Sequence, residues 1–164
     1  MQGVTIRDTA ADDYEVVSAL NLAEVQHTSP MDALRVAALA ALSCYFKVAC
    51  LEDRVSAFLL AMCSGAPYDN ENFYWFARAY PQFIYIDRIV VSRGARGLGL
   101  GSLLYRDLFH YARERAIPLV TCEYNIVPPN EPSRLFHDKF GFREQATQWV
   151  ANGGKLVSLQ VAET

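Results

Sequence analysis

A run of closely spaced glycines between two apolar stretches constrains this sequence more than any other feature. The stretch before it, residues 83–90 (FIYIDRIV), has the aromatic and β-branched composition of a strand. The stretch after it, residues 103–113 (LLYRDLFHYAR), is typical of a helix. A glycine-rich turn that leads from a strand into a helix exposes backbone N–H groups at the positive helix end, and such a site binds phosphate. The sequence therefore predicts a ligand that carries phosphate.

Three known phosphate-binding turns can be compared with this segment. A P-loop needs a Lys directly after its second glycine, but Leu100 follows Gly99 here. A dinucleotide-binding fingerprint needs Gly-x-Gly-x-x-Gly, and Ser102 takes the place of the last glycine. Glu123 lies roughly where the acidic residue of that fingerprint is expected, yet only one such unit is visible, late in the chain. The third pattern, Arg-x-x-Gly-x-Gly, is satisfied in full by residues 96–101.

A second pattern follows the predicted helix. Residues 117–124 (IPLVTCEY) read as a strand, and a loop with two prolines then leads to a short helix at residues 131–140. Asn130 is predicted to cap the start of this helix, and Gly141 to end it in the left-handed conformation. The whole pattern is Asn-x-x-Ser-x-x-x-His-x-x-x-Gly-Phe. Its Asn, Ser and His are spaced to lie on one helical face.

Together the two patterns resemble the GCN5-related N-acetyltransferase (GNAT) superfamily, clearly over residues 83–142 and by strand order elsewhere. The resemblance implies acetyl-CoA as cofactor and transfer of its acetyl group to a primary amine, on a small molecule, an amino acid or a peptide N-terminus. It also implies two strands that splay apart around the pantetheine arm. The implied cofactor-binding residues are Ile89, Val90, Val91, Arg96, Gly97, Leu98, Gly99, Leu100, Gly101, Ser102, Asn130 and Ser133.

The acceptor amine must lose a proton before it attacks, and a carboxylate is the usual base. Glu123 and Asp87 are lone acids inside apolar strands, where a charge is costly unless it has a partner. Glu123 is the first candidate for the base and Asp87 the second. The alternatives are an exposed strand-edge carboxylate for Glu123 and a salt bridge to Arg88, or another cation, for Asp87.

The leaving thiolate needs an acid, and the family commonly carries a Tyr four residues before the glycine that ends the last helix. His137 occupies this position here. An imidazole can protonate a thiolate near neutral pH, so His137 is a candidate acid. The alternative is a packed or solvated side chain. Tyr85 and Tyr124 are lesser candidates, as polar wall or proton donor.

The chain of 164 residues suits a single domain over residues 1–164. The expected order of elements is β, α, α, β, β, β, α, β, α, β, β. This is an α/β (α+β) fold with a mixed, mostly antiparallel sheet of six or seven strands and about four helices. The aromatic run at residues 73–76 is assigned no element. Its two interpretations are core packing and a wall over the acceptor pocket.

Charge and composition argue against several classes of partner. The net charge is −3, and the basic cluster of Arg88, Arg93 and Arg96 lies at the phosphate turn, so nucleic acid is not expected. No apolar run reaches the length of about 20 residues that spans a membrane, and no signal-peptide pattern precedes the first strand. A cytoplasmic protein is therefore expected. A homodimer, and a CoA-binding regulatory module without catalysis, are left open.

Cysteine and histidine usage gives no sign of a metal site. Four cysteines lie in apolar stretches without Cys-x-x-Cys spacing, and they are predicted to be buried free thiols, as a reducing cytoplasm allows. His27, His110 and His137 show no metal-ligand spacing.

Overall fold

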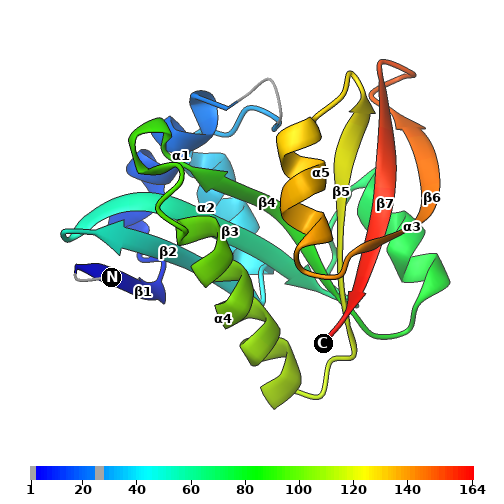
Figure 1. Cartoon of the computed structure of the whole chain (residues 1–164), viewed down its shortest axis with the longest axis horizontal. Helices are drawn as coiled ribbons and strands as arrows, with labels where there is room; N and C mark the ends of the chain where they lie inside the picture. Colours follow the sequence, from blue (N-terminus) through cyan, green and yellow to red (C-terminus); the bar gives the residue numbers. More distant parts are fainter. Residues whose placement is uncertain (1–2, 25–27) are drawn as a thin grey trace. The chain divides into compact units, whose positions relative to one another are not determined.

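The computed structural model describes residues 3–24 and 28–164. Two short 3₁₀ turns, η1 (Ala11–Asp13) and η2 (Arg93–Ala95), accompany the helices and strands. No helix within these described ranges is long and apolar enough to cross a lipid bilayer. The main elements (Figure 1) are, in chain order, β1 (Val4–Asp8), α1 (Tyr14–Leu22), α2 (Ala33–Leu42), β2 (Tyr45–Leu51), β3 (Arg54–Cys63), α3 (Glu71–Ala79), β4 (Ile84–Val91), α4 (Leu100–Glu114), β5 (Leu119–Val127), α5 (Glu131–Asp138), β6 (Arg143–Val150) and β7 (Lys155–Glu163).

The strands form a seven-stranded sheet with the order β1-β2-β3-β4-β5-β7-β6. Pairing is antiparallel for β1–β2, β2–β3, β5–β7 and β6–β7, and parallel for β4–β5, where Ile84 lies opposite Val120. The predicted mixed, mostly antiparallel sheet is confirmed. The chain divides into two compact units: unit 1 is Met1–Met62 with Ile86–Phe109, and unit 2 is Cys63–Tyr85 with His110–Thr164. A single domain over residues 1–164 stays a prediction.

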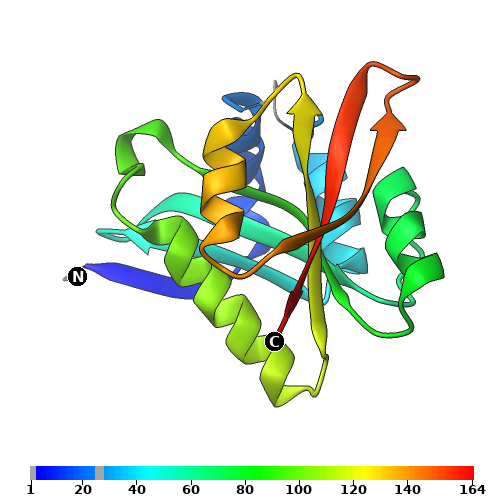
Figure 2. The same cartoon turned by 45° about the vertical axis from the view of Figure 1, so that its right-hand side comes forward.

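In unit 1, successive side chains of β2 point to helices on opposite faces, as the pleat of a strand requires. Tyr45 donates a hydrogen bond of 2.7 Å to Asp107 of α4, and Lys47 donates one of 2.8 Å to the same carboxylate. Phe46, between them, stacks on Tyr14 of α1 with ring centroids 6.4 Å apart. Helix α4 therefore covers one face of β2 and β3, and α1 and α2 cover the other (Figures 1 and 2).

In unit 2, β5 divides its side chains in the same way. Glu123 accepts a hydrogen bond from Tyr85 of β4, whose ring lies among the aromatic side chains of α3. Tyr124, the next residue, points to the opposite face, where its ring lies 5.7 Å from that of His137 in α5. Helices α3 and α5 therefore cover opposite faces of this part of the sheet.

The expected order of elements is wrong at one place, because it lacks the helix α3 between β3 and β4. The described part of the chain therefore has five α-helices and not four. The aromatic run at residues 73–76 hides the helical period because all of its members are large and apolar. Phe73 and Phe76 are buried against Tyr85 of β4, whereas Tyr74 is 44% exposed. The Asn70 side chain begins the helix by accepting hydrogen bonds from two backbone N–H groups. Core packing is thus confirmed for Phe73 and Phe76.

The cysteines divide into two kinds. Cys50 and Cys122 are buried free thiols, as predicted, and burial raises the pKa of the Cys122 thiol well above its usual value. Cys44 and Cys63 are disulfide-bonded, so the prediction of free thiols is wrong for these two. Their spacing in the sequence matches no motif from which a disulfide could be predicted.

Candidate active site

The glycine-rich segment of unit 1 forms the predicted turn between strand and helix. The turn η2 follows directly on β4 and is closed by a hydrogen bond of 3.0 Å from the Ala95 N–H to the Ser92 carbonyl. Gly97 and Gly99 both have a φ of +79°, in the left-handed region that glycine adopts at little cost. The two glycines therefore form the turn between η2 and the start of α4.

The start of α4 presents a set of hydrogen-bond donors. The first hydrogen bond that belongs to the helix runs from the Leu103 N–H to the Gly99 carbonyl, at 3.0 Å. The N–H groups of residues 99–102 precede it and so have no acceptor inside the helix. Oriented donors at the positive end of a helix dipole fit the diphosphate of a CoA cofactor.

Two arginines at this turn pair with a carboxylate that follows α1. Arg96 donates to Glu24 at 2.5 Å, and Arg93 lies 3.6 Å from the same carboxylate. Arg93 also donates to the Ala23 carbonyl, at 3.3 Å. The Glu24 side chain is only 13% exposed, and both guanidinium groups lie within 4 Å of it. Within unit 1, Glu24 therefore partly neutralises the cations next to the donor set.

A pocket of about 270 Å³ lies between α1 and the segment that leads into the turn. Its walls are mostly apolar, which suits an uncharged part of a ligand. The lining residues are Val16, Ala19, Leu20, Ala23, Glu24, Val91, Ser92 and Arg93.

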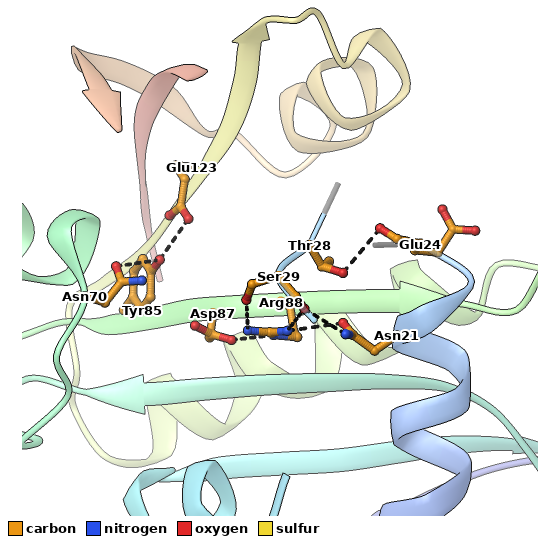
Figure 3. Close-up of polar contacts among 9 residues, drawn as sticks. All are labelled: Asn21, Glu24, Thr28, Ser29, Asn70, Tyr85, Asp87, Arg88 and Glu123. Atoms are coloured by element: carbon orange, nitrogen blue, oxygen red, sulfur yellow. Dashed lines mark hydrogen bonds and ion pairs between the residues drawn. The ribbon is translucent and has the colours of Figure 1, made fainter. Parts of the chain in front are cut away.

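Asp87 forms a buried ion pair, which is the alternative to a catalytic role (Figure 3). The Arg88 Nε donates to Asp87 at 2.6 Å. The Nη1 of Arg88 donates to the Asn21 side chain at 3.2 Å and the Ser29 carbonyl at 3.0 Å, and its Nη2 donates to the Ser29 hydroxyl at 3.1 Å. These bonds attach the segments on both sides of residues 25–27 to β4. A buried guanidinium with a carboxylate and three neutral acceptors favours the interpretation of Asp87 as an ion-pair partner.

Replacing Asp87 with Ala should lower the free energy of unfolding by about 3–5 kcal/mol, because it leaves the buried Arg88 without its carboxylate. Urea unfolding followed by circular dichroism measures this. The exposed Asp12 is the matched control, and Asp12→Ala should change the free energy by less than about 0.5 kcal/mol. An unfolding curve of Asp87→Ala that overlays the wild-type curve would contradict the assignment of a stabilising ion pair.

Glu123 belongs to a separate hydrogen-bonded group in unit 2 (Figure 3). The Tyr85 hydroxyl donates to its Oε1 at 2.9 Å, and the same hydroxyl lies 3.4 Å from the Asn70 Oδ1. Glu123 is half-buried, and its strand β5 lies between β4 and β7 in the sheet. The alternative of an exposed carboxylate on an edge strand is therefore wrong. A half-buried carboxylate whose position is held by a phenol remains a candidate general base.

The three polar residues predicted on one face of α5 contact one another. The Asn130 side chain accepts from the Ser133 N–H at 3.3 Å, which confirms the predicted cap. The Nδ1 of His137 lies 2.7 Å from the Ser133 carbonyl and so carries the ring proton. His137 is 4% exposed, and burial lowers its pKa. A neutral imidazole with this proton bonded inside the helix favours the packed interpretation of His137 over the catalytic acid. Gly141, with a φ of +77°, follows the helix as expected.

His137 should make the stability of the protein depend on pH. Its pKa is lowered in the folded state, so below about pH 6.5 the unfolded chain binds a proton that the folded chain does not. The free energy of unfolding should fall as the pH falls from about 6.5 toward the folded pKa, by up to about 1.4 kcal/mol per pH unit. Urea unfolding between pH 7.5 and 5 measures this slope.

The variant His137→Phe should lose this part of the pH dependence, because Phe does not titrate. The variant Tyr74→Phe is the control, since it removes only an exposed hydroxyl of α3, and it should keep the wild-type slope. Identical slopes for wild type and His137→Phe would refute the assignment.

The structure brings together some of the predicted site residues and adds others. In unit 1, Ser92 and η2 connect residues 89–91 to the turn at residues 96–102, and the Asp87 carboxylate accepts from Arg88. In unit 2, Glu123 accepts a hydrogen bond from Tyr85, and Ser133 contacts both Asn130 and His137. The sequence analysis missed Asn21, Glu24, Ser29 and Asn70. For Asn70 a signal exists, because Asn followed by Glu is typical of a helix start.

No group of three or more His, Cys, Asp or Glu side chains that could hold a metal ion occurs among residues 3–24 and 28–164. His27 lies outside the described residues.

Comparison with known proteins agrees with the fold and the turn. The profile of the acetyltransferase (GNAT) family matches residues 5–142. The chain therefore belongs to the acetyltransferase (GNAT) family. Phosphinothricin N-acetyltransferase from Streptomyces coelicolor is 35% identical over 95 residues, which cover 58% of this chain and 50% of the relative. The match thus spans half the length of that curated relative.

Solved structures share the fold. Ard1 from Thermoplasma volcanium superposes with a TM-score of 0.78 at 18% identity, covering 99% of this chain and 98% of that one. The structure of yncA from Salmonella typhimurium with its cofactor acetyl-CoA gives a TM-score of 0.73 at 19% identity, covering 99% and 94%. Both confirm the GNAT fold predicted from the sequence.

Proposed function

We propose that this protein is an acetyl-CoA-dependent N-acetyltransferase that acetylates a primary amine by direct attack in a ternary complex. The observation that carries the proposal is the turn between β4 and α4, where the left-handed Gly97 and Gly99 lead into the N–H groups at the start of α4. This donor set suits a diphosphate. Membership of the acetyltransferase family and the name of the Streptomyces coelicolor relative support the same activity.

Each part of the proposed site has a chemical task. Acetyl-CoA supplies an activated acetyl thioester. The backbone of residues 96–102 would hold its diphosphate and the backbone of residues 89–91 its pantetheine arm, and Asn130 and Ser133 are the other predicted cofactor contacts. Glu123 accepts the proton of the acceptor ammonium, which makes the amine nucleophilic. Asp87 and His137 are the remaining candidates for base and acid, although their contacts favour structural roles.

The acceptor is proposed to be a small molecule, an amino acid or a peptide N-terminus that carries a primary amine. The relative named phosphinothricin N-acetyltransferase supports a small acceptor. The apolar pocket beside residues 91–93 supports an acceptor or cofactor with an uncharged part. A cytoplasmic location and a homodimer belong to the same proposal.

The test is release of CoA thiol from acetyl-CoA with a panel of amines, amino acids and peptides, each compared with a reaction without amine. Steady release that requires the amine supports the transferase. Binding of CoA by calorimetry without release for any amine would support the regulatory module instead, and absence of both would overturn the proposal.

Replacing Glu24 with Gln should tighten CoA binding about fivefold. The carboxylate pairs with Arg93 and Arg96, and its removal frees both cations for the anionic cofactor; a partly exposed ion pair is worth about 1 kcal/mol. Calorimetry with CoA measures the dissociation constant. Glu15→Gln is the matched control on the exposed part of α1 and should bind as wild type does. Equal or weaker binding by Glu24→Gln would show that Glu24 does not compete with the cofactor.

A further inference from the structure

The Tyr85 hydroxyl connects the candidate base to the start of α3 (Figure 3). It donates to the Glu123 Oε1 at 2.9 Å and lies 3.4 Å from the Asn70 Oδ1. The same Asn70 oxygen accepts from the N–H groups of Asn72 and Phe73, each at 3.0 Å. One hydroxyl therefore lies between a carboxylate on β5 and the oxygen that caps a helix.

Aromatic packing fixes the Tyr85 ring in unit 2. The side chain is fully buried, with an exposed fraction of 0%. Phe73 and Phe76 of α3 lie against it with ring centroids at 5.7 and 5.9 Å, and Tyr68 lies at 6.3 Å. A ring enclosed on several sides has little rotational freedom, so its hydroxyl is a fixed point for the more exposed carboxylate.

The register of β4 and β5 places the side chains of Tyr85 and Glu123 close together on one face of the sheet. Tyr85 of β4 lies opposite Thr121 of β5, and Glu123 follows two residues later on the same face. The carboxylate therefore points toward the α3 side of the sheet, where the phenol holds one of its oxygens. A base must be held within a fraction of an ångström of its working position, since a misplacement of about 1 Å can cost about a hundredfold in rate.

We propose that Tyr85 is a positioning residue that orients the Glu123 carboxylate. The inference rests on the proposed function, because it assigns Tyr85 a role only if Glu123 acts as the base. Tyr85 does not itself exchange a proton with the acceptor. Its effect passes through Glu123, so removing its hydroxyl should matter only while Glu123 is present.

A double-mutant cycle tests this dependence. Tyr85→Phe should lower kcat about tenfold, while the dissociation constant of acetyl-CoA by calorimetry changes less than about twofold. In the Glu123→Gln background, the same Tyr85→Phe change should alter kcat less than about twofold. The control is Tyr74→Phe, which removes an exposed hydroxyl of α3 bonded to Asp69 and should leave kcat unchanged.

The outcomes separate the inference from the proposed function. Three outcomes would each overturn the positioning role. Tyr85→Phe could keep the wild-type kcat, or it could lose kcat equally in the wild-type and Glu123→Gln backgrounds. The loss of kcat could also follow the folded fraction measured by circular dichroism. Full activity of Glu123→Gln would overturn the assignment of the base, and the role of Tyr85 with it. Absence of amine-dependent thiol release in the wild type would overturn the transferase and the inference together.

Discussion

The variant Glu123→Gln should lose about 10² to 10⁴ in kcat, the usual contribution of a positioned general base. Gln keeps the shape of the side chain and can still accept from the Tyr85 hydroxyl, but it cannot take a proton from an ammonium group. The dissociation constant of acetyl-CoA should change less than about twofold, because the carboxylate acts on the amine. Steady-state thiol release and calorimetry measure the two quantities.

The loss of kcat in Glu123→Gln should become smaller as the pH rises. At high pH more of the acceptor amine is already deprotonated in solution, so the reaction depends less on a base in the protein. The control is Glu163→Gln at the exposed end of β7, which should have wild-type kcat at every pH. Full activity of Glu123→Gln together with an inactive, folded Asp87→Asn would reverse the ranking of the two acids. Full activity of both would mean that the acceptor arrives deprotonated.

Features that depend on local backbone requirements could be predicted from the sequence. The turn at residues 91–102 needs glycine at left-handed positions, and both Gly97 and Gly99 adopt them. The cap at Asn130 likewise depends on a side chain and a backbone N–H three residues apart. Short-range geometry of this kind is encoded by residue type and spacing, so it is visible without knowing the rest of the fold.

Partners that are distant in the sequence could not be predicted. Glu24 and Arg96 are 72 residues apart, and Arg88 and Ser29 are 59 apart. Nothing in the spacing of these residues indicates their contact, since the register of β4 and the path of the chain after α1 decide it. The same holds for Tyr85 and Glu123, which the parallel pairing of β4 and β5 brings together.

His137 shows the difference between predicting a position and predicting a role. The spacing from Asn130 and Ser133 predicts a shared helical face, and the contacts among these residues confirm it. The role depends on burial and on the partner of the ring proton, which the sequence does not encode. The ring packs against Tyr124 and Phe142, and its Nδ1 is bonded to a helix carbonyl, so its surroundings favour packing.

Replacing Gly99 with Val should weaken acetyl-CoA binding by about a hundredfold or more. Gly99 has a φ of +79°, which a β-branched residue adopts only with strain, so the N–H groups that follow should lose their alignment. The added side chain also obstructs close approach of the diphosphate to the backbone. Losing one or two charge-assisted hydrogen bonds, at about 1.5–3 kcal/mol each, accounts for this magnitude. Calorimetry with acetyl-CoA measures the change.

A control variant must separate the effect of backbone strain on acetyl-CoA binding from the loss of the phosphate site. The matched position is a second glycine with a positive φ. Gly153 has a φ of +83° at the tip of the β6–β7 hairpin, and a side chain there would meet nothing within 4 Å. Gly153→Val should therefore lower stability through backbone strain and still bind acetyl-CoA as the wild type does. If Gly99→Val is folded and binds acetyl-CoA with wild-type affinity, the backbone of this turn does not hold the diphosphate. The turn between β4 and α4 would then no longer support the proposed activity.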